Sequence, residues 1–350
     1  MNTMPTLSRR TFLVLAATAA ATSRARAAAP AELVGLNFSF LDVDRSRVSA
    51  CRERGRGHSV YGQGFLTRYR EAAVRDRVKA ILARLREERV TAIRHNLWFI
   101  DDDRAPRDVF AVRQPGLAED MTGLFIDDMR AAGLRSLLLS MSPVGQSLPG
   151  CRKVQWGDCF RPATVDSTMR FVTGVAKAAA RQLGQDLYMD PCNEGVPSNA
   201  VRPPLRASMT DFLEAGVRTL AALRPAPRIA ISTQANRADE RLAIVGRILD
   251  ATRVRLDLLD IHIYGDTRTR PDAATLTRFR DFARGRGASL LVGEIQADPG
   301  TIGYARSVLR KGDAADPIGY FPWPLGNPAT GCHADMNVID LLGTLSRSRD

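Results

Sequence analysis

Two glutamates each end an apolar run, and together they could carry out acid–base and nucleophilic chemistry. In residues 185–195, QDLYMDPCNEG, the apolar run stops abruptly, which predicts a buried strand and then a loop carrying Asn193 and Glu194. Glu294 follows the apolar run of LLVGEIQAD in the same way. Because burial raises the pKa of a carboxyl group, we expect Glu194 to hold a proton near neutral pH and to donate it. Glu294 could face it across a bound substrate.

Further polar and aromatic side chains gather where other apolar runs stop. Such positions are typical of residues that contact a ligand at the carboxyl edge of a parallel sheet. The candidates for substrate binding are Asn37, Arg94, Trp98, Asn193, His262, Tyr264 and Trp323. The remaining histidines, His58, His95 and His333, have no metal-ligand spacing, so we expect no metal ion and no other cofactor.

Strand-like and helix-like segments that could position these residues alternate from residue 32 onward. Eight such pairs favour a single-domain α/β fold, the (β/α)8 TIM barrel, over residues 31–350. A doubly wound open sheet is the competing architecture, but no glycine-rich fingerprint follows the first strand. The expected strands are 33–40, 90–100, 134–141, 187–189, 228–232, 256–264, 289–295 and 318–322. The expected helices are 67–88, 118–132, 163–183, 209–223, 239–250, 273–284, 302–309 and 335–346.

The first thirty residues have the pattern of a targeting segment. Arg9 and Arg10 in SRRTFL form a twin-arginine signature, and a short apolar stretch and a small-residue cleavage region follow. The apolar stretch is shorter than the roughly 20 residues of a membrane span, so we expect cleavage rather than anchoring. Residues 1–30 are therefore predicted to be a signal peptide, and the mature protein to be periplasmic or secreted, without a membrane anchor.

The charge and cysteine content narrow the class of protein further. The formal net charge is +12, but the basic residues are scattered and are not interleaved with aromatics, so we expect no nucleic-acid partner. Five cysteines fit an oxidising compartment. Cys151 and Cys159 could form a local disulfide and Cys51 could pair with Cys332, which would leave Cys192 as a free thiol. We expect the protein to be a monomer.

In the order and placement of these motifs, the chain resembles the clan A glycoside hydrolases, the retaining barrel glycosidases that include the family 5 cellulases and mannanases. The motifs are Asn193-Glu194 after the fourth strand, His262-x-Tyr264 after the sixth, Gly293-Glu294 after the seventh and Trp323 after the eighth, together with Arg94 on the second. The resemblance covers the whole mature chain and implies an oligosaccharide or polysaccharide substrate.

The resemblance also implies a role for each matching residue. Glu194 would be the acid/base and Glu294 the nucleophile of a double displacement. Arg94 and Tyr264 would keep Glu294 ionised by lowering its pKa. The resemblance further implies that Asn193 binds the sugar 2-hydroxyl, that Trp323 stacks on the sugar ring and that His262 forms a hydrogen bond near the nucleophile.

Two other functions use the same residues. A transglycosylase would need the same pair of carboxylates and differ only in its acceptor. A barrel that binds glycans without cleaving them is the non-enzymatic alternative, and the presence of both glutamates argues against it. A serine hydrolase is not supported, because Ser140 and Ser142 lie outside any G-x-S-x-G pattern.

Overall fold

The computed structural model describes residues 33–38, 65–100, 109–143, 162–201, 203–264, 270–297, 299–313, 316–323 and 342. All described residues belong to a single unit of the chain, Glu32–Asp350. The predicted signal peptide, the cysteines other than Cys192, and most of the predicted helix 335–346 lie outside the described residues. Within the described residues, no helix is both long and apolar enough to cross a membrane.

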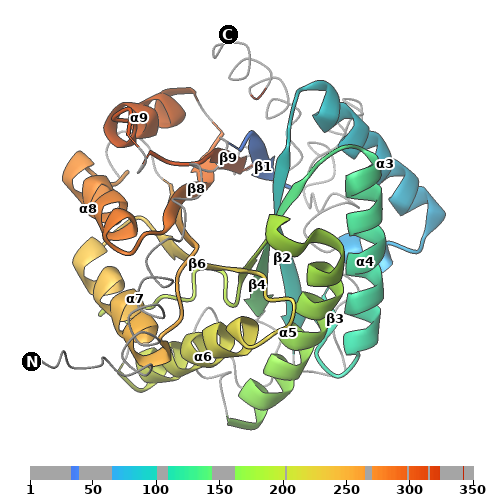
Figure 1. The fold of residues 1–350 in the computed structure, drawn as a ribbon, viewed down its shortest axis with the longest axis horizontal. Helices are drawn as coiled ribbons and strands as arrows, with labels where there is room; N and C mark the ends of the chain where they lie inside the picture. The colour runs from blue at the N-terminus through green and yellow to red at the C-terminus, as the bar shows by residue number, and fades with distance from the viewer. Residues whose placement is uncertain are drawn as a thin grey trace, which may run out of the picture. The chain divides into compact units, whose positions relative to one another are not determined.

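Eight parallel strands form a near-closed barrel, as the alternation of segments predicts (Figure 1). The order of strands in the sheet follows their order in the chain, apart from a two-residue strand that pairs with β2 and was not predicted. The strands are β1 (Gly35–Asn37), β2 (Ala92–Ile100), β3 (Phe110–Ala111), β4 (Ser136–Pro143), β5 (Leu187–Asp190), β6 (Arg228–Gln234), β7 (Leu258–Ile263), β8 (Ser289–Gln296) and β9 (Tyr320–Trp323).

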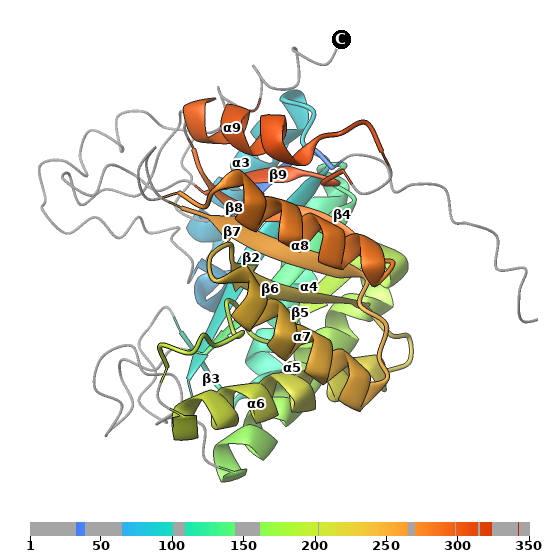
Figure 2. The ribbon, with the colours of Figure 1, turned by 90° about the vertical axis from the view of Figure 1, so that its left-hand side faces the viewer.

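Seven α-helices of the described residues lie around the strands, and successive helices from α4 to α9 contact one another (Figures 1 and 2). They are α3 (Ala72–Glu87), α4 (Pro115–Ala131), α5 (Pro162–Leu183), α6 (Pro203–Ala221), α7 (Ala238–Thr252), α8 (Ala273–Gly285) and α9 (Pro299–Leu309). Each confirms a helix expected from the sequence. Short 3-10 helices, η1 (Phe65–Arg68) and η3 (Gly184–Asp186), precede α3 and β5.

The helix ends show how local chemistry sets the boundaries. Helix α3 buries Val74, Val78, Ile81, Leu82 and Leu85, the apolar face expected from their spacing. Four of the described helices (α4, α5, α6 and α9) begin at a proline, in three cases several residues before the predicted start. Proline lacks an N–H and has a fixed φ, so it is favoured in the first turn although it breaks helix interiors.

Two layers of different chemistry fill the inside of the barrel. We call the first the basal apolar layer; it is a cluster of buried side chains consisting of Ala92, Leu138, Tyr188, Ala230, Leu258, Leu291, Ile318 and Phe321. Side chains alternate along a strand, so residues two positions further on point to the same side. Five residues that lie two positions beyond members of the basal apolar layer, together with Asn37 of β1, form what we call the buried polar layer. Its members are at most 1% exposed: Asn37, Arg94, Ser140, Asp190, Ser232 and Asp260.

The barrel closes between β1 and β9, where two glycines let the strands approach. Leu33 forms a parallel bridge with Gly319, and the ring of Phe321 packs directly over Gly35. A Cβ atom on Gly35 would lie 2.3 Å from the Phe321 ring and 2.8 Å from the Ala92 carbonyl oxygen. The seam therefore depends on a position without a side chain.

We expect Gly35→Ala to lower the free energy of unfolding by about 1–3 kcal/mol, because the added methyl group overpacks this seam. The control is Gly303→Ala in helix α9, where an added Cβ meets nothing within 4 Å. Alanine there should be neutral or stabilise by about 0.5–1 kcal/mol. Urea denaturation of both variants measures the difference, and equal stability of the two would contradict this account of the seam.

Candidate functional site

Arg94 lies at the centre of the buried polar layer and is the main cation of the site. Its side chain is fully buried and forms ion pairs with two carboxylates. Its Nε donates to Oδ2 of Asp260 at 3.0 Å, and its Nη1 donates to Oε1 of Glu294. A buried charge is stable only when it is paired and hydrogen-bonded, so these contacts fix Asp260 and Glu294 around the guanidinium.

Three asparagines complete the shell around Arg94. Its Nη1 donates to the amide oxygens of Asn37 and Asn96, each at 3.0 Å, and its Nη2 donates to Asn193 at 2.6 Å. The amide nitrogen of Asn37 in turn donates to backbone carbonyls of Gly293 and Phe321, on β8 and β9. One guanidinium thus links β1, β2, β7, β8 and the loop after β5.

A tight turn after β5 aims Glu194 into the site. The N–H of Gly195 donates to the carbonyl of Cys192 at 2.9 Å, and Glu194 has a left-handed φ of 52°. Such a φ is strained for a residue with a side chain, and strain of this kind often marks functional positions. The backbone N–H of Glu194 donates to the Ser232 hydroxyl at 2.7 Å, and Gln234 donates to Oε2 of Glu194 at 3.0 Å.

The turn also gives Cys192 a structural role that its position in the sequence did not indicate. Its thiol is free and buried, as expected for the odd cysteine. Its N–H donates to Oδ1 of Asp190 at 3.2 Å, and its side chain fills the space beside Gly195, where a Cβ would lie 2.7 Å from the sulfur. A small apolar side chain fits this turn.

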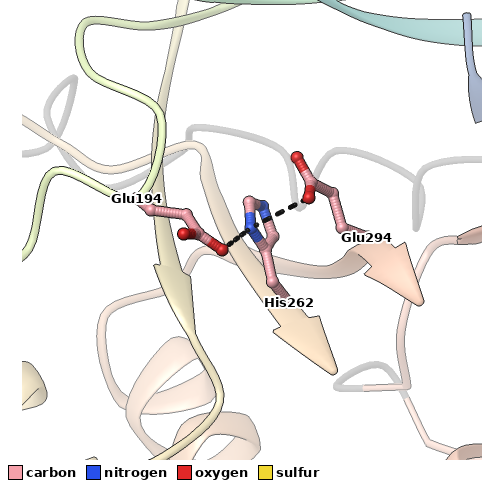
Figure 3. Close-up of side chains that lie close together, drawn as sticks. All are labelled: Glu194, His262 and Glu294. Carbon is pink, nitrogen blue, oxygen red and sulfur yellow. Dashed lines mark hydrogen bonds and ion pairs between the residues drawn. The ribbon is translucent and has the colours of Figure 1, made fainter. Parts of the chain in front are cut away.

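His262 lies between the two glutamates (Figure 3). Its Nδ1 is 2.8 Å from Oε1 of Glu194 and 3.6 Å from Oε2 of Glu294. Tyr264, two residues further along, donates its hydroxyl to Oε2 of Glu294, and Asn96 donates to Oε1 at 3.4 Å. The imidazole therefore joins the two carboxylates into one unit.

Both expectations about the carboxyl pKa values are wrong. Burial raises the pKa of Glu194, but the hydrogen bond and charge of His262 outweigh it, so the pKa lies below its ordinary value. Burial raises the pKa of Glu294, and the charges of His262 and Arg94 offset this only in part. Burial lowers the pKa of His262, but the charges of Glu294 and Asp260 prevail and raise it to about 10. The three groups titrate as a coupled set.

Glu194, His262 and Glu294 lie close enough together to be considered as a metal site. One oxygen of Glu194, one ring nitrogen of His262 and one oxygen of Glu294 all lie within 4.8 Å of one another, the only such group among the described residues. Arg94, however, already contacts both His262 and Glu294 and supplies the positive charge there. We therefore assign no metal to these residues.

The structure brings most of the predicted site residues together. Asn37, Arg94, Asn193, Glu194, His262, Tyr264 and Glu294 form one connected network. Trp98 lies near the carboxyl end of β2 and Trp323 at that of β9, where stacking on a sugar stays a prediction. Trp98 is partly exposed, whereas Trp323 is buried.

Sequence reasoning missed two buried carboxylates of the network, Asp190 and Asp260. Asp190 accepts hydrogen bonds from the hydroxyls of Ser140 and Ser232, and Asp260 pairs with Arg94. The predicted strand 187–189 ends before Asp190 and so places it in the loop, whereas Asp260 falls inside the predicted strand 256–264. The usable signal was alternation, because Asp260, His262 and Tyr264 are spaced by two and must share one face.

Comparisons with known proteins establish the fold and no family. No family model matches the chain, and no curated protein matches it in sequence.

Among solved structures, a β-1,4-D-mannanase from Cryptopygus antarcticus is 12% identical, with a TM-score of 0.57 over 90% of each chain. An exo-β-1,4-mannosidase from Opitutaceae bacterium strain TAV5 is 12% identical, with a TM-score of 0.53 over 82% of this chain and 57% of its own. A sugar phosphate isomerase/epimerase from Anabaena variabilis, described as putative, is 10% identical, with a TM-score of 0.48 over 80% of this chain and 92% of its own. At such identities the likeness shows the barrel fold alone.

We expect Arg94→Met to lower the free energy of unfolding by about 3–5 kcal/mol, because it leaves Asp260 and Glu294 buried without their counter-charge. The control is Arg278→Met, which removes a pair with Asp239 whose side chains are 55% and 78% exposed. An exposed pair contributes about 0–1 kcal/mol. Urea unfolding at neutral pH compares the two, and a loss in Arg94→Met no larger than in the control would rule out a central role for the guanidinium.

Proposed function

We propose that the protein is a retaining glycoside hydrolase whose two catalytic groups are Glu194 and Glu294. The observation that carries the proposal is their separation: an oxygen of one carboxylate lies within 4.8 Å of an oxygen of the other. Retaining glycosidases hold their carboxyl groups about 5–5.5 Å apart, whereas inverting enzymes need about 6.5–9.5 Å to admit a water molecule. The short separation favours double displacement.

The reaction would proceed in two steps. In the first, Glu294 attacks the anomeric carbon while Glu194 protonates the leaving oxygen, so that a glycosyl-enzyme forms. In the second, Glu194 removes a proton from water, which attacks the anomeric carbon and releases Glu294. The contacts of each residue support this division: Arg94, Asn96 and Tyr264 donate to Glu294, and such donors favour the ionised form that a nucleophile requires.

The other predicted residues divide into groups that hold the carboxylates and groups that could meet the sugar. Arg94, His262 and Asn37 are at most 1% exposed, so they act through their contacts with the network. Asn193 is partly exposed beside Glu194 and can reach the sugar 2-hydroxyl. Trp98 and Trp323 are the candidates for stacking against a sugar ring.

The substrate would be an oligosaccharide or polysaccharide, with β-1,4-linked mannosides as the first class to examine. Two solved structures with the same fold are named as a β-1,4-D-mannanase and an exo-β-1,4-mannosidase. The twin-arginine pattern of the first thirty residues supports a periplasmic or secreted location, where such a polymer would be met.

We expect Glu194→Ala and Glu294→Ala each to lower kcat/KM on an aryl β-mannoside by at least about 10²-fold, because each removes one of the two catalytic groups. Azide should restore turnover of a dinitrophenyl substrate with opposite stereochemistry in the two variants. In Glu294→Ala it replaces the nucleophile and gives the inverted glycosyl azide. In Glu194→Ala it attacks the glycosyl-enzyme and gives the retained product.

The control for this experiment is Glu214→Ala, which removes a glutamate on helix α6 that pairs with Arg218 outside the site. It should keep full activity. Retention by the unmodified protein is checked by proton NMR of the first-formed sugar. Full activity of either site variant, or an inverted product from the unmodified protein, would contradict the proposal. Transfer to an added sugar acceptor in preference to water would identify a transglycosylase with the same site.

A further inference from the structure

Asp260 is a buried carboxylate that the proposed reaction does not use directly. It is fully buried and lies two residues before His262 on the same face of β7. Its Oδ2 is 3.0 Å from Nε of Arg94 and 3.4 Å from Nε2 of His262. Its Oδ1 has no hydrogen-bond partner. A buried carboxylate oxygen without a partner is costly, so Arg94 and His262 must hold Asp260 in place.

The neighbouring strand is shaped to admit this carboxylate. A Cβ atom on Gly293 would lie 1.9 Å from Oδ1 of Asp260. Gly293 directly precedes Glu294, so any side chain at this position would displace Asp260 from the space beside the second glutamate. Gly293 on β8 therefore leaves the space that the Asp260 carboxylate of β7 occupies.

The charges around His262 favour a protonated imidazole. Three carboxylates face the ring: Glu194 from the loop after β5, Asp260 from its own strand and Glu294 from β8. Among the described residues, the cation that contacts the ring is Arg94 from β2, and the Tyr264 ring centroid lies 6.4 Å from that of His262. A neutral imidazole would leave two buried carboxylates and the partly exposed Glu194 with a single guanidinium as counter-charge, and a second positive charge lowers that imbalance.

The contact between Arg94 and the ring is compatible with this protonation state. A guanidinium can only donate, so the 3.0 Å contact of its Nη2 with Nε2 would be a hydrogen bond only to a neutral ring. Nη2 already has an acceptor in Asn193 at 2.6 Å, however. Oδ2 of Asp260 then offers Nε2 an acceptor of its own, and Oε1 of Glu194 accepts from Nδ1.

We propose that Asp260 is a positioning residue that keeps His262 as an imidazolium, and that this imidazolium passes a proton to Glu194 in each catalytic cycle. The second half rests on the proposed glycosidase function. Glu194 accepts hydrogen bonds at both carboxylate oxygens, so it is deprotonated in the structure. It therefore needs a proton donor before it can act as an acid.

The proton balance of the cycle closes without another reactant. The Nδ1 proton moves to Oε1 of Glu194, and the ring keeps its Nε2 proton toward Asp260. Glu194 gives the proton to the leaving oxygen as the glycosidic C–O bond breaks, with the electron pair going to that oxygen, while Glu294 forms the new C–O bond. Water then attacks the anomeric carbon, Glu294 leaves with its electron pair, and the proton of water returns through Glu194 to His262.

Nitrogen NMR of the histidine rings tests the first half without any need for turnover. The sequence has four histidines, and the His262 signals are those lost in His262→Gln and those close to the ring of Tyr264. We expect both ring nitrogens of His262 to be protonated at pH 8 in the unmodified protein. A neutral ring at pH 8 would overturn the proposal. Assignment through the nearby ring of Tyr264 makes this result independent of whether the variant folds.

Two matched variants identify which carboxylate keeps the His262 ring protonated. Asp260→Asn should lower the titration midpoint of His262 by at least about one pH unit, because it removes an adjacent opposite charge. Asp190→Asn changes another fully buried carboxylate, which contacts Ser140 and Ser232 instead of the ring, and should shift the midpoint by less than about half a unit. Equal shifts in the two variants would refute a specific role for Asp260.

The pH dependence of kcat/KM tests the second half. In Asp260→Asn the alkaline limb should move to lower pH together with the His262 midpoint, whereas a merely structural defect would lower activity equally at all pH values. If the alkaline limb of the pH profile does not move, the proposed transfer of a proton from His262 to Glu194 is wrong. If no glycoside is cleaved by the unmodified protein, the proposed function fails, and the NMR titration still decides the Asp260–His262 pairing.

Discussion

A fully buried guanidinium is the constraint on which the rest of this barrel depends. Arg94 cannot lose its charge, so every one of its donors has to meet an acceptor inside the protein. The acceptors come from β1, β2, β7, β8 and the loop after β5, and two of them are carboxylates. Satisfying a single side chain thus brings together strand ends that are up to 200 positions apart in the sequence.

This constraint explains why the inside of the barrel is divided as it is. The basal apolar layer fills the barrel at the amino-terminal ends of the strands and keeps water from reaching Arg94 from that side. The buried polar layer could not exist there as scattered groups, because each unpaired polar atom would cost free energy. It persists because its members satisfy one another: Asp190 accepts from Ser140 and Ser232, and Ser232 accepts from the N–H of Glu194. The strained turn at Glu194 is held by these contacts.

The fold could be predicted from the sequence because its signals are local. The spacing of Val74, Val78 and Leu85 gives a helix face without any knowledge of its neighbours, and the abrupt ends of apolar runs give the strands. Helix starts at Pro203 and Pro299 were missed because the predicted helices begin at apolar residues further along, Met209 and Ile302. The candidate site residues were found at strand ends, but Asp190 was assigned to a loop and Asp260 lay inside a predicted strand. The pKa directions depended on partners that only the folded chain supplies.

The difference between the two glutamates lies in what each carboxylate faces. Both are largely buried, so burial alone cannot make one an acid and the other a nucleophile. Glu294 accepts hydrogen bonds from a guanidinium, an amide and a phenol, and none of these exchanges a proton readily near neutral pH. The His262 ring lies farther from it, at 3.6 Å, than from Glu194, at 2.8 Å. Glu194 faces an amide and an imidazole, and the imidazole can both give and accept a proton. A group that must gain and lose a proton in each cycle belongs beside such a partner, whereas a group that must stay ionised belongs beside a fixed cation.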